Sequence, residues 1–185
     1  MGNFYTNITL QGPEQDQIAD YLRETGRAAF VSPTQKGLTL VFDALGDSQD
    51  TEVLADISAK LSARFRCPAL VVLNHDDDIL WYQLHQDGQL KDEYNSAPDY
   101  FGASASSEPT GGDAAALCAA FGVPDVADRV ESILREDYLF ALERHQDLTD
   151  ALGLPDLAIG GGYRYIESGD APPGLEQSRL IRTGG

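Results

Sequence analysis

The 185-residue sequence is poor in the side chains that most often carry catalysis or cross-links. It has two cysteines, three histidines, one tryptophan and one methionine. Two cysteines cannot form the dense disulfide framework of a small secreted domain. Cys67 precedes an apolar stretch and Cys118 lies in an alanine-rich stretch, and neither has a histidine close to it in the sequence. We therefore interpret both as small, buried thiols.

Long apolar runs and a leader sequence are also missing. No stretch approaches 18 consecutive apolar residues, and the first residues have neither a basic segment nor an apolar one. We therefore expect no membrane span and no signal peptide, and we predict a cytoplasmic location.

The motifs of common enzyme and metal sites do not occur. GxSxG, HExxH and CxxC are absent, so we predict no catalytic residue, no cofactor and no metal site. The run His75-Asp76-Asp77-Asp78 offers an imidazole and three carboxylates, which suit a hard cation. Neighbours in an extended chain point to opposite faces, however, and the EF-hand glycine and distal glutamate are missing. The run is more typical of a solvated turn.

Basic residues are scarce. Lysine and arginine number 13 against 30 acidic residues, which gives a formal net charge of −17 and a pI of about 4.2. Residues 1–100 carry 16 acids and 7 bases, and residues 101–185 carry 14 and 6, so the charge is not confined to one arm. Such a field repels nucleic acid and anionic membranes, and it favours basic partners. Solubility alone is the other explanation of the charge.

Alternating apolar residues predict strands, and helical spacing predicts helices between them. Gly12-Pro13 ends the first strand and opens the first helix, and Asp87-Gly88 is a strong signal for a two-residue hairpin turn. The predicted strands are residues 4–11, 27–32, 38–43, 69–73, 79–85 and 89–94, and the predicted helices between them are residues 13–26 and 50–66.

This order predicts an α+β protein with a ferredoxin-like βαββαβ core, both helices on one face, extended by a β-hairpin. Residues 69–73 (ALVVL) are apolar on both faces, which favours an interior strand. Adding the hairpin beside that strand places it inside the sheet. The predicted strand order is therefore 2-3-1-4-5-6, in an antiparallel-rich sheet.

The rest of the chain predicts a mainly helical extension that packs on the sheet domain. Residues 1–101 form the predicted sheet domain, residues 102–112 (GASASSEPTGG) a linker, and residues 113–185 the extension. Helices are expected from Asp113 to about Phe121 and over roughly 125–151. The glycine triplet 160–162 lacks the spacing of a phosphate-binding loop, so we interpret it as a bend before a candidate last strand at 159–166. The polar tail is expected to be loose.

The predicted hairpin holds the candidate binding residues. Trp81 and His85 share the more polar face of its first strand, and Tyr82 lies on the other face. Tryptophan and tyrosine are enriched as anchors of interfaces. Packing of Trp81 under the C-terminal helices is the alternative. The residues predicted to contact a partner are Asp76, Asp77, Asp78, Trp81, Tyr82 and His85.

Residues 71–101 (VVLNHDDDILWYQLHQDGQLKDEYNSAPDYF) resemble small acidic bacterial proteins, some of which look like the immunity proteins that neutralise toxins. The resemblance implies an inhibitor and transfers no functional residue. We therefore expect a non-enzymatic, acidic binding protein of the immunity or inhibitor type, whose partner is a basic protein such as a toxin. Two alternatives stay open. One is an enzyme or small-ligand-binding protein with a pocket between the sheet and the C-terminal helices, near Trp81, Tyr82 and His85. The other is a structural subunit.

Overall fold

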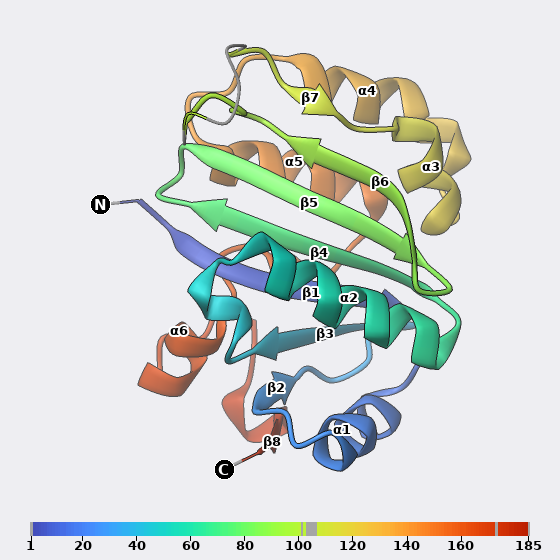
Figure 1. The fold of residues 1–185 in the computed structure, drawn as a ribbon, viewed down its shortest axis with the longest axis vertical. Coiled ribbons are helices and arrows are strands. Elements are labelled where there is room, and N and C mark those ends of the chain that lie inside the picture. The colour runs from blue at the N-terminus through green and yellow to red at the C-terminus, as the bar shows by residue number, and fades with distance from the viewer. Residues whose placement is uncertain (1, 101, 103–106, 173, 185) are drawn as a thin grey trace.

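One antiparallel sheet organises the chain, with helices on both of its faces (Figure 1). The computed structural model describes residues 2–100, 102, 107–172 and 174–184. The strands are β1 (Phe4–Gln11), β2 (Ala29–Val31), β3 (Leu38–Asp43), β4 (Pro68–His75), β5 (Ile79–Gln86), β6 (Gln89–Asn95), β7 (Thr110–Gly111) and β8 (Ile181–Thr183). The helices are α1 (Gln15–Glu24), α2 (Thr51–Phe65), α3 (Ala114–Ala120), α4 (Ala127–Arg135), α5 (Ala141–Leu152) and α6 (Tyr163–Ser168). The predicted α+β class is confirmed.

The sheet has eight strands in the order β7-β6-β5-β4-β1-β3-β2-β8, and every pairing is antiparallel. The predicted order 2-3-1-4-5-6 is corrected, because the sheet continues by one strand beyond each predicted edge. β7 has two residues and β8 has three, which is too short for an alternating pattern to show in the sequence. Both are edge strands that exist because a neighbouring strand pairs with them.

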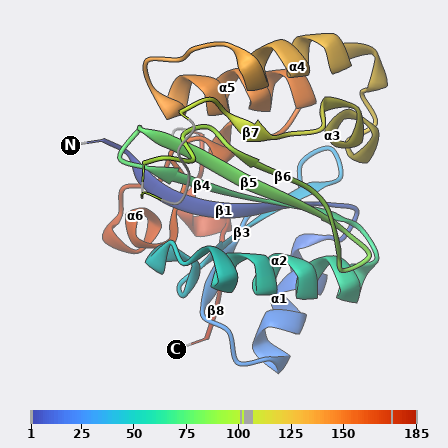
Figure 2. The same ribbon diagram turned by 45° about the horizontal axis from the view of Figure 1, so that its top comes forward.

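The two faces of the sheet carry different helices (Figure 2). α1 and α2 cover one face, where Ile8, Val71 and Leu73 pack against their buried residues. α3, α4 and α5 cover the opposite face over Leu70 and Val72. β4 is therefore apolar on both sides, and it lies between β1 and β5 as the ALVVL run predicts.

The C-terminal third differs from the sequence prediction in three places. Residues 103–106 of the predicted linker lie outside the described residues, and Thr110–Gly111 forms β7 rather than linker. The candidate last strand at 159–166 is instead the glycine bend followed by α6. The tail also returns to the sheet as β8, beside β2.

The glycine triplet is a close-packed bend. A Cβ atom on Gly161 would lie 2.4 Å from the carbonyl oxygen of Leu157, and one on Gly162 would lie 3.0 Å from Cβ of Tyr5. Asp47 then accepts hydrogen bonds from the first backbone N–H groups of α6, at 3.3 Å from Tyr163 and 2.7 Å from Arg164. The N-terminus of α6 is thereby occupied by a side chain of the protein itself.

Both thiols are buried and unpaired, as predicted. Burial raises the pKa of Cys67 to about 11, and it also raises the pKa of Cys118. No helix in the described part of the chain is both long and apolar enough to cross a membrane.

Candidate functional site

The aspartate run forms the tight turn between β4 and β5. Asp76 and Asp77 have positive φ angles of 52° and 64°, and the N–H of Asp78 donates to the carbonyl of His75 at 3.0 Å. Two consecutive residues with positive φ are the mark of a type I′ hairpin turn, which aspartate tolerates better than most residues. The prediction of a turn is confirmed. Asp76 and Asp78 are exposed, whereas Asp77 is partly buried.

Asp77 joins three parts of the molecule. Its carboxylate accepts hydrogen bonds from the backbone N–H of Asn3, at 3.0 Å, and from the Asn3 side-chain amide, at 2.9 Å. Its carbonyl accepts the backbone N–H of Ala141 at 2.6 Å, at the first turn of α5. Phe140 offers no capping side chain there, so the turn itself satisfies that donor. The N-terminus, the β4–β5 turn and the start of α5 consequently meet at one end of the sheet (Figure 1).

Replacing Asp77 by glycine is expected to lower the free energy of unfolding by about 1–2 kcal/mol, because the Asn3 donors lose a charged acceptor. Glycine keeps the positive φ without strain, so the change isolates the carboxylate. The matched control is Asp76→Gly, at the same kind of φ with an exposed carboxylate, which should change stability by less than about 0.5 kcal/mol. Urea unfolding of both variants measures this, and equal effects would remove the anchoring role of Asp77.

The loop from α4 to α5 lies beside this turn and is held by Arg144. This arginine is 5% exposed, and it donates to the carbonyls of Leu134 at 2.9 Å and Glu136 at 2.7 Å and to the hydroxyl of Tyr94. A cation at the last carbonyls of α4 is favourable because the helix dipole is negative there. Its guanidinium also lies over the ring of Tyr138, 4.8 Å from the centroid. The hydrogen bonds of Arg144 therefore satisfy backbone carbonyls at the C-terminal end of α4.

Two cavities open on either side of Tyr138, which lines both. The first, of about 420 Å³, has four carboxylates in its wall, and the second, of about 440 Å³, has three. We call the residues that line them the acidic groove. Among the described residues of that lining, Arg144 is the one basic side chain. The seven carboxylates are Asp77, Asp78, Glu108 and Asp137 in the first cavity, and Glu143, Asp147 and Asp150 in the second.

Tyr138 is fixed by the acids around it. Its hydroxyl donates to Asp147 at 2.7 Å, and its pKa is raised, first by burial and then by that hydrogen bond to a carboxylate. The phenol is a neutral donor between the two cavities. Its ring stacks on the Arg144 guanidinium and forms part of the wall of both cavities.

Exposed apolar side chains gather at the rim of the groove. Of the five large hydrophobic residues that are exposed in the described chain, three are Tyr100, Leu139 and Phe140, and Leu139 is 81% exposed. Leu139 lines the first cavity, and the hydroxyl of Tyr100 donates to Asp78 at 3.1 Å. Apolar residues beside an acidic groove give a surface that offers both apolar contact and charge to a partner.

The other three predicted contact residues lie inside the protein. Trp81 is 7% exposed and packs in the core beneath α1 and α2, so the alternative that placed it under the C-terminal helices is corrected: alternation along β5 turns Trp81 to the opposite face. Tyr82 lies under the C-terminal helices, and its hydroxyl donates to Asp92 at 2.7 Å. The ring of His85 is 3.0 Å from the Ser58 hydroxyl on α2, and burial lowers its pKa. None of the three lines the groove.

Sequence reasoning missed the half of the groove that belongs to α5. Glu143, Asp147 and Asp150 are spaced i, i+4, i+7, so they share one helix face, and that face carries no base. Like charges at this spacing repel and weaken a helix. That spacing is readable in the sequence and marks one acidic face of the helix. In the described residues, no group of three or more histidine, cysteine, aspartate or glutamate side chains is placed to hold a metal ion.

Comparison of the chain with protein-family models, with curated proteins and with solved structures finds no match.

Proposed function

We propose that this chain is an acidic binding protein of the inhibitor type, and that the acidic groove receives basic side chains of a protein partner. The observation that carries the proposal is the pair of cavities divided by Tyr138, with seven carboxylates in their walls. Each cavity has the volume to take a lysine or arginine side chain. The exposed Leu139 and Phe140 beside them would supply the apolar contact that an interface core needs.

The electrostatics of the whole chain support this choice of partner. A net charge of −17 attracts a basic surface from a distance and speeds encounter, while the groove gives local contacts that resist dissociation. Arg144, the one basic side chain among the described residues of the groove wall, donates to carbonyls and a phenol hydroxyl rather than to a carboxylate. A toxin with a basic, phosphate-binding cleft is the kind of partner that fits, and neutralising it would be the function.

The test compares two triple variants with the same change of charge. The groove variant carries Asp137→Asn, Glu143→Gln and Asp150→Asn, and the control carries Asp16→Asn, Glu24→Gln and Glu52→Gln, which are exposed on α1 and α2. The groove variant is expected to bind the basic partner about tenfold or more weakly, and the control less than about threefold. Calorimetric titration against a partner captured by cross-linking in the native cells measures both.

Two further readouts make the outcome decisive. The affinity should fall steeply with salt, because the Debye length is only about 8 Å at physiological ionic strength. The groove variant should differ in stability from the parent chain by less than about 1 kcal/mol, because Asp150→Asn relieves repulsion with Asp147 whereas Glu143→Gln removes a charge that the helix dipole favours in the first turn of α5. Equal weakening by the two variants would mean that total charge, and not the groove, attracts the partner. Binding indifferent to salt and to both variants would end the proposal.

The structure also contains a cavity at the position that the enzyme or small-ligand alternative requires. The first cavity does lie between the end of the sheet and the C-terminal helices, although Trp81, Tyr82 and His85 do not line it. Its described lining has serines, carboxylates and Tyr138, with no cysteine and no histidine to act as nucleophile or base. Serine hydroxyls and carboxylates can themselves act as nucleophile and base, so an activity screen is the test of this alternative.

Two finer assignments are proposals of the same kind. A ferredoxin-like core is supported by the antiparallel order β4-β1-β3-β2 and by α1 and α2 on one face. A cytoplasmic location is supported by the two buried thiols, which stay unpaired in the fold and suit a reducing compartment.

A further inference from the structure

The loop between α4 and α5, residues 136–140, carries an exposed apolar pair. Leu139 is 81% exposed and Phe140 is 48% exposed, and they are the only sequence neighbours among the large hydrophobic residues exposed in the described chain. A single exposed apolar side chain is ordinary on a protein surface, whereas two neighbours beside a cavity form a patch. The patch raises the question of what keeps this loop from burying it.

Both ends of the α4–α5 loop are fixed by backbone hydrogen bonds. At its start, the N–H of Glu136 donates to the carbonyl of Ser132 at 2.8 Å. At its end, the N–H of Ala141 donates to the carbonyl of Asp77 in the β4–β5 turn, at 2.6 Å. Because the loop is short and both of its ends are tied, few backbone conformations are open to it.

Tyr138 fixes the middle of the loop. Its ring packs against the core under the C-terminal helices, and its hydroxyl donates to Asp147 on α5 at 2.7 Å. The guanidinium of Arg144 lies 4.8 Å from the centroid of the same ring. The loop therefore turns one aromatic side chain inward and leaves the next residue, Leu139, at the surface.

Arg144 contacts the start and the middle of the loop at once. Its guanidinium donates to the carbonyls of Leu134 at 2.9 Å and Glu136 at 2.7 Å, and it stacks on Tyr138. It also donates to the hydroxyl of Tyr94 on β6, which joins the loop to the sheet. One buried side chain thus links α4, the loop and the sheet.

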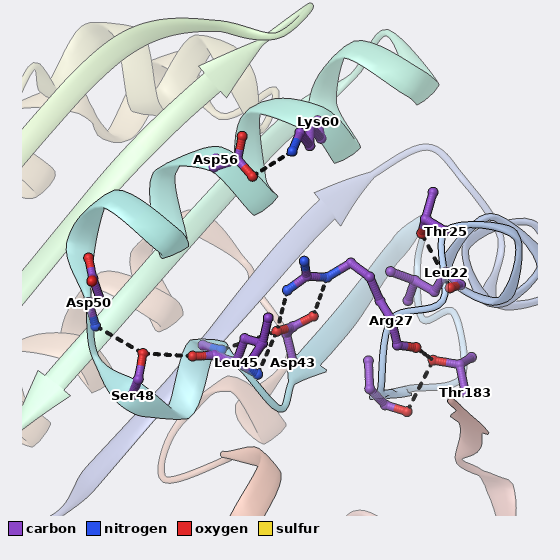
Figure 3. Close-up of polar contacts among 12 residues, drawn as sticks. Leu22, Thr25, Arg27, Asp43, Leu45, Ser48, Asp50, Asp56, Lys60 and Thr183 are labelled. Atoms are coloured by element: carbon purple, nitrogen blue, oxygen red, sulfur yellow. Dashed lines mark hydrogen bonds and ion pairs between the residues drawn. The ribbon is translucent and has the colours of Figure 1, made fainter. Parts of the chain in front are cut away.

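The hydrogen bonds of Arg144 differ in kind from those of Arg27. Arg27 donates to the carboxylate of Asp43, through Nε at 2.8 Å and Nη2 at 2.7 Å (Figure 3). Arg144 donates instead to carbonyls and a phenol hydroxyl. A buried cation is costly unless its donors are satisfied, and a lysine lacks the planar fork that reaches several acceptors while stacking on a ring. Arg144 is therefore suited to orienting the backbone rather than to balancing a charge.

We infer that Arg144 is the positioning residue of the partner surface, and that it holds the loop so that Leu139 and Phe140 are the apolar anchors for a basic protein. A loop that is ordered in advance loses little conformational entropy on binding. Charge complementarity selects the partner, because the carboxylates of Asp137 and Glu143, which line the two cavities, flank the apolar pair in the sequence. The identity of the partner rests on the proposed function, whereas the order of the loop is a property of the chain alone.

The first experiment measures the order of the loop in the free chain by relaxation of the amide nitrogens. In the parent chain the order parameters of residues 137–140 are expected near the rigid-backbone value of about 0.85, and Arg144→Lys should lower them below about 0.6. The matched control is Arg135→Lys, which should leave them unchanged, because Arg135 donates to the carbonyls of Gly111 and Gly112 and not to the loop. Tyr138→Leu is a second variant that keeps Arg144 and should lower the same values.

The second experiment measures apolar contact with two synthetic peptides of equal charge, each of about twelve residues, in which lysine alternates with leucine or with serine. The parent chain should bind the leucine peptide about tenfold more tightly than the serine peptide. Leu139→Ala and Arg144→Lys should each reduce this preference to about threefold or less. Leu45→Ala is the control and should retain the preference, because Leu45 is 62% exposed and lines neither cavity.

The outcomes separate the inference from the proposed function. An ordered loop in both Arg144→Lys and Tyr138→Leu would overturn the inference, whatever binds in the groove. A loosened loop that keeps the full preference for the leucine peptide would overturn it as well. The proposed function fails by a different result, in which the groove variant binds the serine peptide as tightly as the parent chain does.

Discussion

Replacing Gly161 by alanine is expected to lower the free energy of unfolding by about 3 kcal/mol, because the added methyl has no space. It would lie 2.4 Å from the carbonyl oxygen of Leu157 and 2.7 Å from the ring of Phe42. Neither neighbour can move easily, because the Leu157 atom belongs to the backbone and the Phe42 side chain is fully buried in the sheet. The carbonyl of Gly161 is itself fixed by the Asn7 amide at 2.9 Å. Urea unfolding at neutral pH gives the value.

Gly160→Ala provides the matched control one residue earlier. Gly160 has a φ of +72°, and nothing lies within 4 Å of a Cβ atom built there. Alanine at this position should cost only about 1 kcal/mol, from the left-handed backbone conformation. A Gly161 variant no less stable than the Gly160 variant would show that the bend relaxes, and the close-packed description of the triplet would then be wrong.

The second large effect is a loss of stability in mild acid that depends on His145. This histidine is fully buried on α5, with Nδ1 2.7 Å from the hydroxyl of Tyr5, and burial lowers its pKa from about 6.5 to about 4. The imidazole is therefore neutral in the folded state and gains a proton more readily when unfolded. Its contribution to stability is complete above pH 6.5 and is lost progressively as the pH falls toward 4. The pKa difference corresponds to roughly 3 kcal/mol.

The measurement compares the pH dependence of two chains rather than their absolute stabilities. His145→Leu will change packing, but it also removes the proton-binding group, so its free energy of unfolding should change about 3 kcal/mol less than that of the parent between pH 6.5 and 4. Taking the difference between the chains cancels the carboxylates, including Asp47, whose pKa burial raises. Parallel pH curves for the two chains would mean that His145 is not the group responsible.

Local signals predict much of the first hundred residues. Asp87-Gly88 turns with φ angles of 53° and 79°, as the hairpin pattern requires. Asp50, one residue before α2, accepts the backbone N–H of Glu52 at 2.9 Å, which is the capping role that its position favours. These features depend on residues that are neighbours along the chain, so they can be predicted from the sequence.

The mistaken strand at 159–166 shows what local signals leave out. Tyr163, Tyr165 and Ile166 favour a strand by residue type, yet they form α6. The acceptor for the first N–H groups of that helix is Asp47, 116 residues earlier in the chain, and the bend before it packs on Tyr5 and Phe42. A conformation decided by residues so distant cannot be recovered from a local pattern.

Only part of the candidate site could be predicted from the sequence, because the rest also depends on contacts between residues far apart in the chain. Alternation along β5 correctly separates Trp81 from Tyr82, but it cannot show that helices cover both faces of the sheet. The aspartate turn is local and was predicted as a turn. Its place beside Tyr138 follows from the contact between Asp77 and the start of α5, which joins residues 64 positions apart.

The position of β1 at the centre of the sheet has a consequence for synthesis of the chain. The face of β1 that meets the C-terminal helices is polar: Asn7 donates to the carbonyls of Ala158 and Gly161, at 2.7 Å and 2.9 Å, and Tyr5 meets His145. These acceptors are made some 150 residues later, on the order of ten seconds at translation rates of about 5–20 residues per second. Throughout that interval the central strand has polar groups without their final partners. Until those residues emerge, water must satisfy these polar groups at the position that becomes a buried strand in the centre of the sheet.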